Sequence, residues 1–145
     1  MRAAALLLAL SACAHRGVPT EGFFLRFGLQ PAPTLLLVSP SWSDRGLAML
    51  EWMEAAKRKQ PELQLALVLM DELPVKQWQV VAKALKVSGA VRRSAGLGLE
   101  APPFGPIKEV PQLFWVDRWG RIVQRAHGFI PQDQFDAQTA HLLGR

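Results

Sequence analysis

Cysteine is almost absent from this chain. Cys13 is the only one among 145 residues. Within these residues there can be no disulfide, no Cys-x-x-Cys redox pair and no multi-cysteine zinc site. Histidine is also scarce, and the three histidines are scattered, with His127 and His141 expected at the surface. We therefore expect neither a metal nor any other cofactor.

Long hydrophobic runs and a strong charge of one sign are missing too. The apolar stretch at residues 3–12 is about half the roughly 20 residues that a membrane-spanning helix needs. Lys and Arg number 17 against 12 Asp and Glu, a net charge of +5. This excess permits weak attraction to an anionic surface but does not indicate nucleic-acid binding. No nucleic-acid partner is expected.

The first 13 residues resemble the signal peptide of bacterial lipoproteins. A positive start at Met1 and Arg2 is followed by the apolar residues 3–12. Residues 10–13, Leu-Ser-Ala-Cys, resemble the lipobox, in which the cysteine is acylated and becomes the new N-terminus. The resemblance implies a signal peptide over residues 1–12 and lipidation of Cys13. The alternative is an ordinary signal peptide that happens to contain a cysteine.

The lipobox also implies a location. Several acyl chains on Cys13 would hold the protein firmly on the periplasmic side of a bacterial membrane, because a single chain anchors only marginally. By resemblance to enterobacterial sorting, Ala14 favours the outer membrane over the inner one. Residues 13–21 are then predicted to be a tether, and residues 22–145 a single folded domain.

Hydrophobic patterning predicts an α/β domain. The apolar runs at 34–38 and 63–70 are typical of strands buried on both faces. An amphipathic helix over 44–59 connects them as a right-handed parallel unit. The other predicted elements are a strand at 22–27, a helix after Pro74, an irregular segment at 88–106, strands at 112–116 and 121–125 around a tight turn at 117–120, and a helix after Pro131.

This order predicts a central mixed β-sheet flanked by helices on both faces. Trp52, Trp78 and Trp115 are expected in or against the core. Further core residues are expected at Leu35, Leu37, Leu67, Leu69 and Phe114.

Three stretches resemble the thioredoxin fold, and more narrowly the periplasmic TlpA/ResA-like thioredoxin proteins. Residues 35–42 resemble the strand and tryptophan that lead into the family's redox motif. Residues 110–117 resemble its cis-proline and the strand that follows, and residues 117–123 resemble its hairpin. The resemblance implies a thioredoxin-like α/β fold with a cis peptide bond between Val110 and Pro111.

The chain departs from this family at the redox motif. Where the family has Cys-x-x-Cys after a tryptophan, this chain has Ser43, Asp44, Arg45 and Gly46 after Trp42. Dithiol exchange needs a thiolate nucleophile and a second thiol that resolves the mixed disulfide, and serine supplies neither. We therefore expect the fold without the dithiol chemistry.

The residues at these positions have structural and functional interpretations. Ser43 and Asp44 fit the N-cap of a helix; an anion pocket that includes Arg45, or a serine nucleophile, are the alternatives. The loop at Val110 and Pro111 is either a structural turn or an edge that pairs with an extended peptide. Trp42 and Trp119 are candidate exposed anchors for a partner.

Five basic residues gather in one part of the sequence. They are expected to form a solvated face, or one that meets anionic headgroups or an acidic partner. These residues are Lys83, Lys86, Arg92, Arg93 and Lys108.

Together these features favour a lipid-anchored, redox-inactive thioredoxin-like module that binds or assembles an envelope protein or peptide. The alternative is an enzyme, a TlpA-type thiol-disulfide oxidoreductase, which the residues at 43 and 46 disfavour. A copper carrier would need closely spaced Cys, Met and His ligands. Met49, Met53 and Met70 are better explained as core residues.

Overall fold

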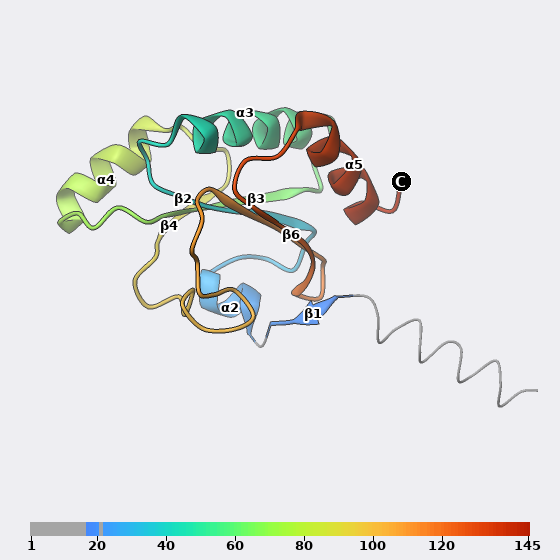
Figure 1. Cartoon of the computed structure of the whole chain (residues 1–145), viewed down its shortest axis with the longest axis horizontal. Coiled ribbons are helices and arrows are strands. Elements are labelled where there is room, and N and C mark those ends of the chain that lie inside the picture. The colour runs from blue at the N-terminus through green and yellow to red at the C-terminus, as the bar shows by residue number, and fades with distance from the viewer. Residues whose placement is uncertain (1–16, 21) are drawn as a thin grey trace, which may run out of the picture.

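One six-stranded mixed sheet organises the chain (Figure 1). The computed structural model describes residues 17–20 and 22–145, so the lipidation prediction at Cys13 lies outside the described residues. The strand order is β1-β6-β5-β2-β3-β4; β2, β3 and β4 are parallel, and β5, β6 and β1 continue the sheet in antiparallel pairs. The strands are β1 Val18–Pro19, β2 Thr34–Ser39, β3 Gln64–Leu69, β4 Ala90–Arg93, β5 Gln112–Val116 and β6 Arg121–His127. The predicted α/β class and mixed sheet are confirmed.

Three helices cover one face of the sheet (Figure 1). They are α3 Asp44–Lys59, α4 Val75–Ala84 and α5 Gln132–Leu142. Alternate residues of the central strands point to this face, because side chains alternate along a strand. Their core partners include Met49 and Met53 of α3 and Phe135 of α5. The predicted core residues on this face are Leu35, Leu37, Leu67, Leu69 and Trp115, which are buried, and Trp52 and Trp78, which pack against them half-buried.

The opposite face is covered by less regular structure. A five-residue helix, α2 Phe23–Phe27, and the irregular segment 94–111 lie across it. Phe114 of the sheet meets Phe104 of this segment edge-on, with ring centroids 5.3 Å apart. Phe27 also packs on Phe104, at 5.6 Å. Helices on both faces are therefore confirmed, although aromatic side chains and loop make most of this second cover.

The strand predicted at residues 22–27 is wrong, because these residues form α2. Phe23 and Phe27 are buried, whereas Leu25 between them is 89% exposed. Buried residues four apart with an exposed one between follow the helical period, not the alternation of a strand. Gly22 at φ 63° and Gly28 at φ 65° bracket the helix in a conformation that glycine adopts without steric cost.

Two edge strands were missed. Val18 and Pro19, predicted as tether, form β1 and pair with Ile122 and Arg121 of β6. Ala90–Arg93, within the segment predicted to be irregular, forms β4 beside β3. Both strands are short and are defined by their pairing with a distant strand, which local patterning does not encode.

The tight turn predicted at residues 117–120 is confirmed. The Oδ1 atom of Asp117 accepts hydrogen bonds from the backbone N–H groups of Trp119 at 3.0 Å and Arg121 at 2.9 Å. Gly120 closes the turn at φ 80°. Among the described helices, none is long and apolar enough to cross a bilayer.

Candidate functional site

The two predicted site stretches meet at one end of the sheet. Val38 at the end of β2 lies beside Gln112 at the start of β5. The residues that follow β2 and those that precede β5 therefore lie at the same end. The Val110–Pro111 peptide bond is cis, as the resemblance implied. Trp119 lies in the turn at the opposite end of β5, so it does not belong to this site.

Ser43 is the N-cap of α3. Its side-chain oxygen accepts a hydrogen bond from the backbone N–H of Gly46 at 3.1 Å. The cap satisfies one of the backbone donors that a helix leaves unpaired in its first turn. Asp44 follows as the first residue of the helix, where a carboxylate interacts favourably with the positive end of the helix dipole. The capping interpretation of Ser43 is confirmed.

Gly46, which the resemblance in sequence aligns with a second redox cysteine, has a side chain of the sheet directly beside it. A Cβ added to Gly46 would lie 3.0 Å from the Cβ of Ser39 and closer still to its Oγ. Ser39 is buried at the end of β2, and its hydroxyl donates to the carbonyl of Pro40 at 2.9 Å. The space for a second thiol is thus taken up by Ser39.

An exposed apolar surface surrounds the start of α3. Trp42 is 75% exposed, Phe129 43% and Val110 38%. The guanidinium carbon of Arg45 lies 6.0 Å from the centroid of the Phe129 ring, within the range of a cation–π contact. The backbone N–H of Gly128 donates to the carbonyl of Pro111 at 2.8 Å, which joins the loops that carry Val110 and Phe129. We call Trp42, Arg45, Val110 and Phe129 the motif surface.

Sequence reasoning missed Phe129. Its ring packs on Trp52 of α3, with ring centroids 5.4 Å apart. The signal available was an aromatic residue directly after the glycine that follows β6. Only the packing of that loop against α3 shows that the residue belongs to this site.

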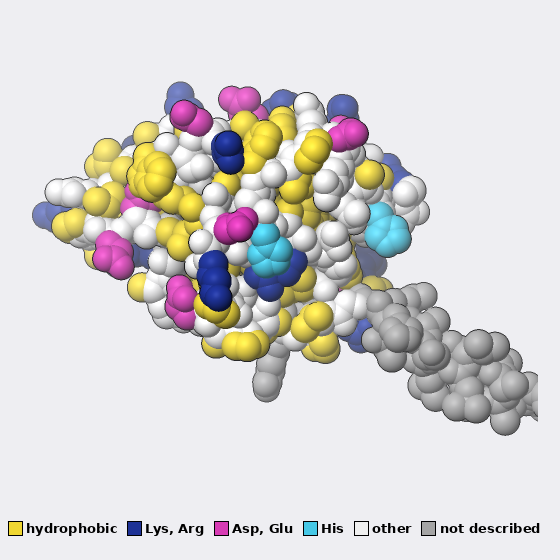
Figure 2. Space-filling model, in the orientation of Figure 1, with side chains coloured by type: hydrophobic (Ala, Val, Ile, Leu, Met, Phe, Trp, Pro, Cys, Tyr) yellow, Lys and Arg dark blue, Asp and Glu magenta, His cyan; other side chains and the backbone are white. Residues whose placement is uncertain are grey.

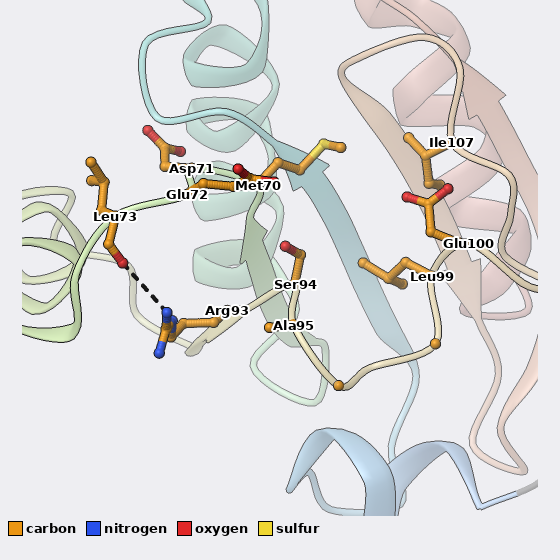
Figure 3. Close-up of a pocket in the computed structure, with 12 residues that line it drawn as sticks. Met70, Asp71, Glu72, Leu73, Arg93, Ser94, Ala95, Leu99, Glu100 and Ile107 are labelled. Carbon is orange, nitrogen blue, oxygen red and sulfur yellow. Dashed lines mark hydrogen bonds between the residues drawn. The ribbon is translucent and has the colours of Figure 1, made fainter.

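A cavity of about 670 Å³ opens beside the ends of β3 and β4 (Figure 3). Met70, Leu99 and Ile107 contribute apolar lining, whereas Asp71, Glu72 and Glu100 contribute carboxylates. Figure 3 shows two sides of the cavity: one carries Leu99, Glu100 and Ile107, and the other carries Leu73 and Arg93. The Arg93 guanidinium donates to the backbone carbonyl of Leu73 at 3.4 Å.

Asp71 connects this cavity to the motif surface. Its carboxylate accepts from the backbone N–H of Ser41 at 2.7 Å and from the Ser41 hydroxyl at 2.6 Å. Ser41 directly precedes Trp42, so a carboxylate of the cavity lining holds the residue next to the motif surface.

The predicted basic face is only partly a solvated face. Arg92 donates to the backbone carbonyls of Phe27 at 2.8 Å and Gly28 at 3.2 Å, so its guanidinium fixes local structure. Arg93 is exposed and also lines the cavity that carries the carboxylates. Lys83, Lys86 and Lys108 are exposed.

The described residues hold no group of three or more His, Cys, Asp or Glu side chains that could bind a metal ion. His127 and His141 are exposed, and the histidine side chains visible in Figure 2 lie apart from one another. Met49 and Met53 are fully buried on the helical face, and Met70 packs against the opposite core. All three methionines therefore contribute to packing.

No family model matches the sequence, and no curated protein is detectably similar to it. Solved structures do match. A thiol:disulfide interchange protein DsbE described as putative, from Chlorobium tepidum, is 18% identical, with a TM-score of 0.65 over 88% of this chain and 92% of that one.

Two further structures resemble the chain at similar identity. StoA from Bacillus subtilis is 18% identical, with a TM-score of 0.59 over 76% of this chain and 84% of that one. The exposed lipoprotein thioredoxin of Streptococcus pneumoniae is 19% identical, with a TM-score of 0.60 over 77% of this chain and 86% of that one. At this identity the likeness establishes the fold, and the fold of this chain is thioredoxin-like.

Proposed function

We propose that this protein is a redox-inactive thioredoxin-like module, anchored by lipid at Cys13 on the periplasmic side of a bacterial membrane, that binds an envelope protein or peptide. The observation that carries the proposal lies at the start of α3. There Ser43 serves as a helix cap, and Ser39 fills the space beside Gly46 that a second thiol would need.

The alternative function is thiol-disulfide exchange. It is favoured by the names of the structural neighbours, among them the DsbE of Chlorobium tepidum. Exchange requires one thiolate to attack a disulfide and a second thiol to release the mixed disulfide. Residues 43 and 46 supply neither sulfur. The structural neighbours therefore support the thioredoxin-like fold of this chain, but they do not support thiol-disulfide exchange by it.

An insulin-reduction assay tests the loss of redox activity. The wild-type protein should show no turnover with dithiothreitol as the reductant, and robust turnover would overturn the proposal. Ser43→Cys with Gly46→Cys restores the two thiols, but overpacking at residue 46 should cost about 1–3 kcal/mol of stability.

The matched control adds Ser39→Gly to these two changes. Removing the Ser39 side chain opens the space beside residue 46, so this triple variant should gain more disulfide exchange than the double variant. Equal stability and equal activity of the two variants would show that Ser39 does not close the site.

The motif surface is the proposed binding region. Trp42 offers a large apolar side chain of the kind that dominates binding energy at interfaces. The backbone around Val110 can pair with an extended segment without any sulfur chemistry. Arg45 adds a positive charge at the rim, which should act mainly on the rate of association.

Crosslinking in the native envelope, followed by titration with the captured partner, tests this region. Trp42→Ala should remove about 2 kcal/mol of binding free energy. Leu25→Ala is the control, because Leu25 is 89% exposed on α2, which covers the opposite face of the sheet from α3. Unchanged affinity for Trp42→Ala would move the binding site elsewhere.

Anchoring is tested separately. Cys13→Ser should abolish lipid attachment and leave the protein either soluble or as an unprocessed precursor. A variant that is processed and fractionates like the wild type would contradict the lipobox interpretation. Separation of inner from outer membranes would test the preference that Ala14 implies.

A further inference from the structure

A second exposed apolar surface lies away from the motif surface. Leu25 of α2 is 89% exposed, Trp119 of the 117–120 turn is 68% exposed, and Val18 of β1 is 52% exposed. Two arginines of the turn accompany them: Arg118 is exposed and Arg121 is half-exposed. We call these five residues, Val18, Leu25, Arg118, Trp119 and Arg121, the turn surface.

Contacts between β1, α2 and the turn bring these residues together. Val18 pairs with Ile122, directly after the turn, and Thr20 donates its backbone N–H to the carbonyl of Gly120 at 3.3 Å. A Cβ added to Gly120 would lie 3.4 Å from the Cβ of Phe23, so the turn packs directly on α2.

The charge of the turn surface is positive. The one described carboxylate in the turn, on Asp117, is engaged by the backbone N–H groups of Trp119 and Arg121. The Arg118 guanidinium lies 5.9 Å from the centroid of the Trp119 ring. Tryptophan bordered by arginine suits the boundary between headgroups and acyl chains, and anionic lipids attract the arginines.

The distance along the chain from Cys13 to the turn surface also favours contact with a lipid bilayer. Cys13 precedes Val18 by five residues, and an extended chain spans at most about 3.6 Å per residue. An acyl anchor on Cys13 would therefore hold Val18 within about 18 Å of the membrane surface. We propose that the turn surface contacts an anionic lipid bilayer. This proposal depends on the lipid anchor at Cys13, which is part of the proposed function.

This orientation has a consequence for the candidate site. β5 runs from Gln112, which follows Pro111 at the motif end, to Val116, which precedes the 117–120 turn at the other end. A domain seated on its turn surface directs the motif surface away from the lipid. Trp42 and Phe129 are then accessible to a partner in the periplasm.

Quenching of tryptophan fluorescence by brominated lipids tests the proposal. The processed full-length protein is reconstituted into vesicles of phosphatidylethanolamine and phosphatidylglycerol with brominated acyl chains. Trp119→Phe should lose most of the quenching. Trp42→Phe is the matched control, since Trp42 is 75% exposed at the other end of the sheet. It should lose the same absolute emission intensity to the brominated lipid as the wild type, so its quenched fraction should not fall.

The charge requirement is tested with Arg118→Glu combined with Arg121→Glu. This variant should be quenched less than the wild type in anionic vesicles, and added salt should reduce wild-type quenching because it screens exposed charges. Unchanged quenching in Trp119→Phe, or its loss in Trp42→Phe, would overturn the proposed orientation.

Mass spectrometry of Cys13 separates the two possible failures. An acylated protein whose Trp119 is not quenched contradicts the turn surface alone. A protein without acyl chains contradicts the anchor, and with it this orientation.

Discussion

The two faces of the sheet are covered by different kinds of structure. Helices α3, α4 and α5 cover one face, whereas α2 and the irregular segment 94–111 cover the other (Figure 1). A helix pairs its own backbone groups except at its ends. An irregular segment must find other partners for its buried carbonyls, because leaving them unpaired is costly.

Arginines supply those partners on the irregular face. Arg125 donates to the carbonyls of Pro103 at 2.8 Å and of Phe104, and to the Gln112 side chain at 2.8 Å. Its guanidinium carbon also lies 4.6 Å from the centroid of the Phe114 ring. Burial lowers the pKa of the Arg125 guanidinium below its ordinary value. A sheet face can thus be closed without a long helix when phenylalanines fill the space and arginines pair with the loop.

The largest expected effect comes from removing one core phenylalanine on each face. Phe104 and Phe135 are both fully buried, one on the irregular face and one on α5. Phe104→Ala and Phe135→Ala should each cost about 3–5 kcal/mol in urea unfolding. Only Phe104→Ala should also speed limited proteolysis within residues 94–111, because that segment loses its apolar contact with the sheet. Equal proteolysis of the two variants would contradict the comparison.

Replacing Arg125 tests the irregular face more specifically. Arg125→Met keeps an apolar stem but leaves two carbonyls and the Gln112 amide oxygen without this donor. It should cost about 2–3 kcal/mol in urea unfolding, since hydrogen bonds to charged groups are among the stronger ones. Arg125→Lys should fall in between, because an ammonium cannot reproduce the planar fork of donors. Arg58→Met, at an exposed position of α3, is the control and should change stability little.

The difference between the faces also explains what the sequence could predict. The helical face was predictable because its elements carry local signals, such as the apolar run of β2 and the amphipathic period of α3. On the irregular face, α2 was misassigned because five mostly apolar residues resemble a strand. The spacing of Phe23 and Phe27, with Leu25 exposed between them, was the signal for a helix.

The candidate site likewise combines features that local sequence predicts with contacts between residues far apart in the chain. The cap at Ser43 depends on neighbours three residues away, so sequence reasoning found it. The bonds between Ser41 and Asp71 join residues 30 positions apart, and Phe129 reaches Arg45 through a distant loop. The obstruction of Gly46 by Ser39 requires side-chain positions as well as topology. No local pattern encodes any of these three.

On the helical face, the ends of the helices should matter more than surface positions within them. Ser43→Ala removes the side-chain acceptor for the Gly46 N–H and should cost about 1 kcal/mol of stability. Ser43→Asp keeps an acceptor and should stay close to the wild type in thermal unfolding. If both variants lose the same stability, the hydrogen bond of the cap is not the cause.

The smallest expected effect is a gain at the other end of a helix. Lys86 follows the C-cap of α4 and has φ 52°, a left-handed conformation that glycine adopts at lower cost than lysine. Lys86→Gly should therefore stabilise the protein by somewhat less than about 1 kcal/mol. It relieves the backbone strain at residue 86, but glycine also gives the unfolded chain more conformational entropy, which offsets part of the gain. Lys83→Gly, inside α4, is the matched control and should destabilise by about 1 kcal/mol, because glycine is a poor helix former. If the free energy of unfolding rises for Lys86→Gly and falls for Lys83→Gly, then the backbone conformation at the end of α4 matters to stability. Equal losses of stability in the two variants would contradict this interpretation.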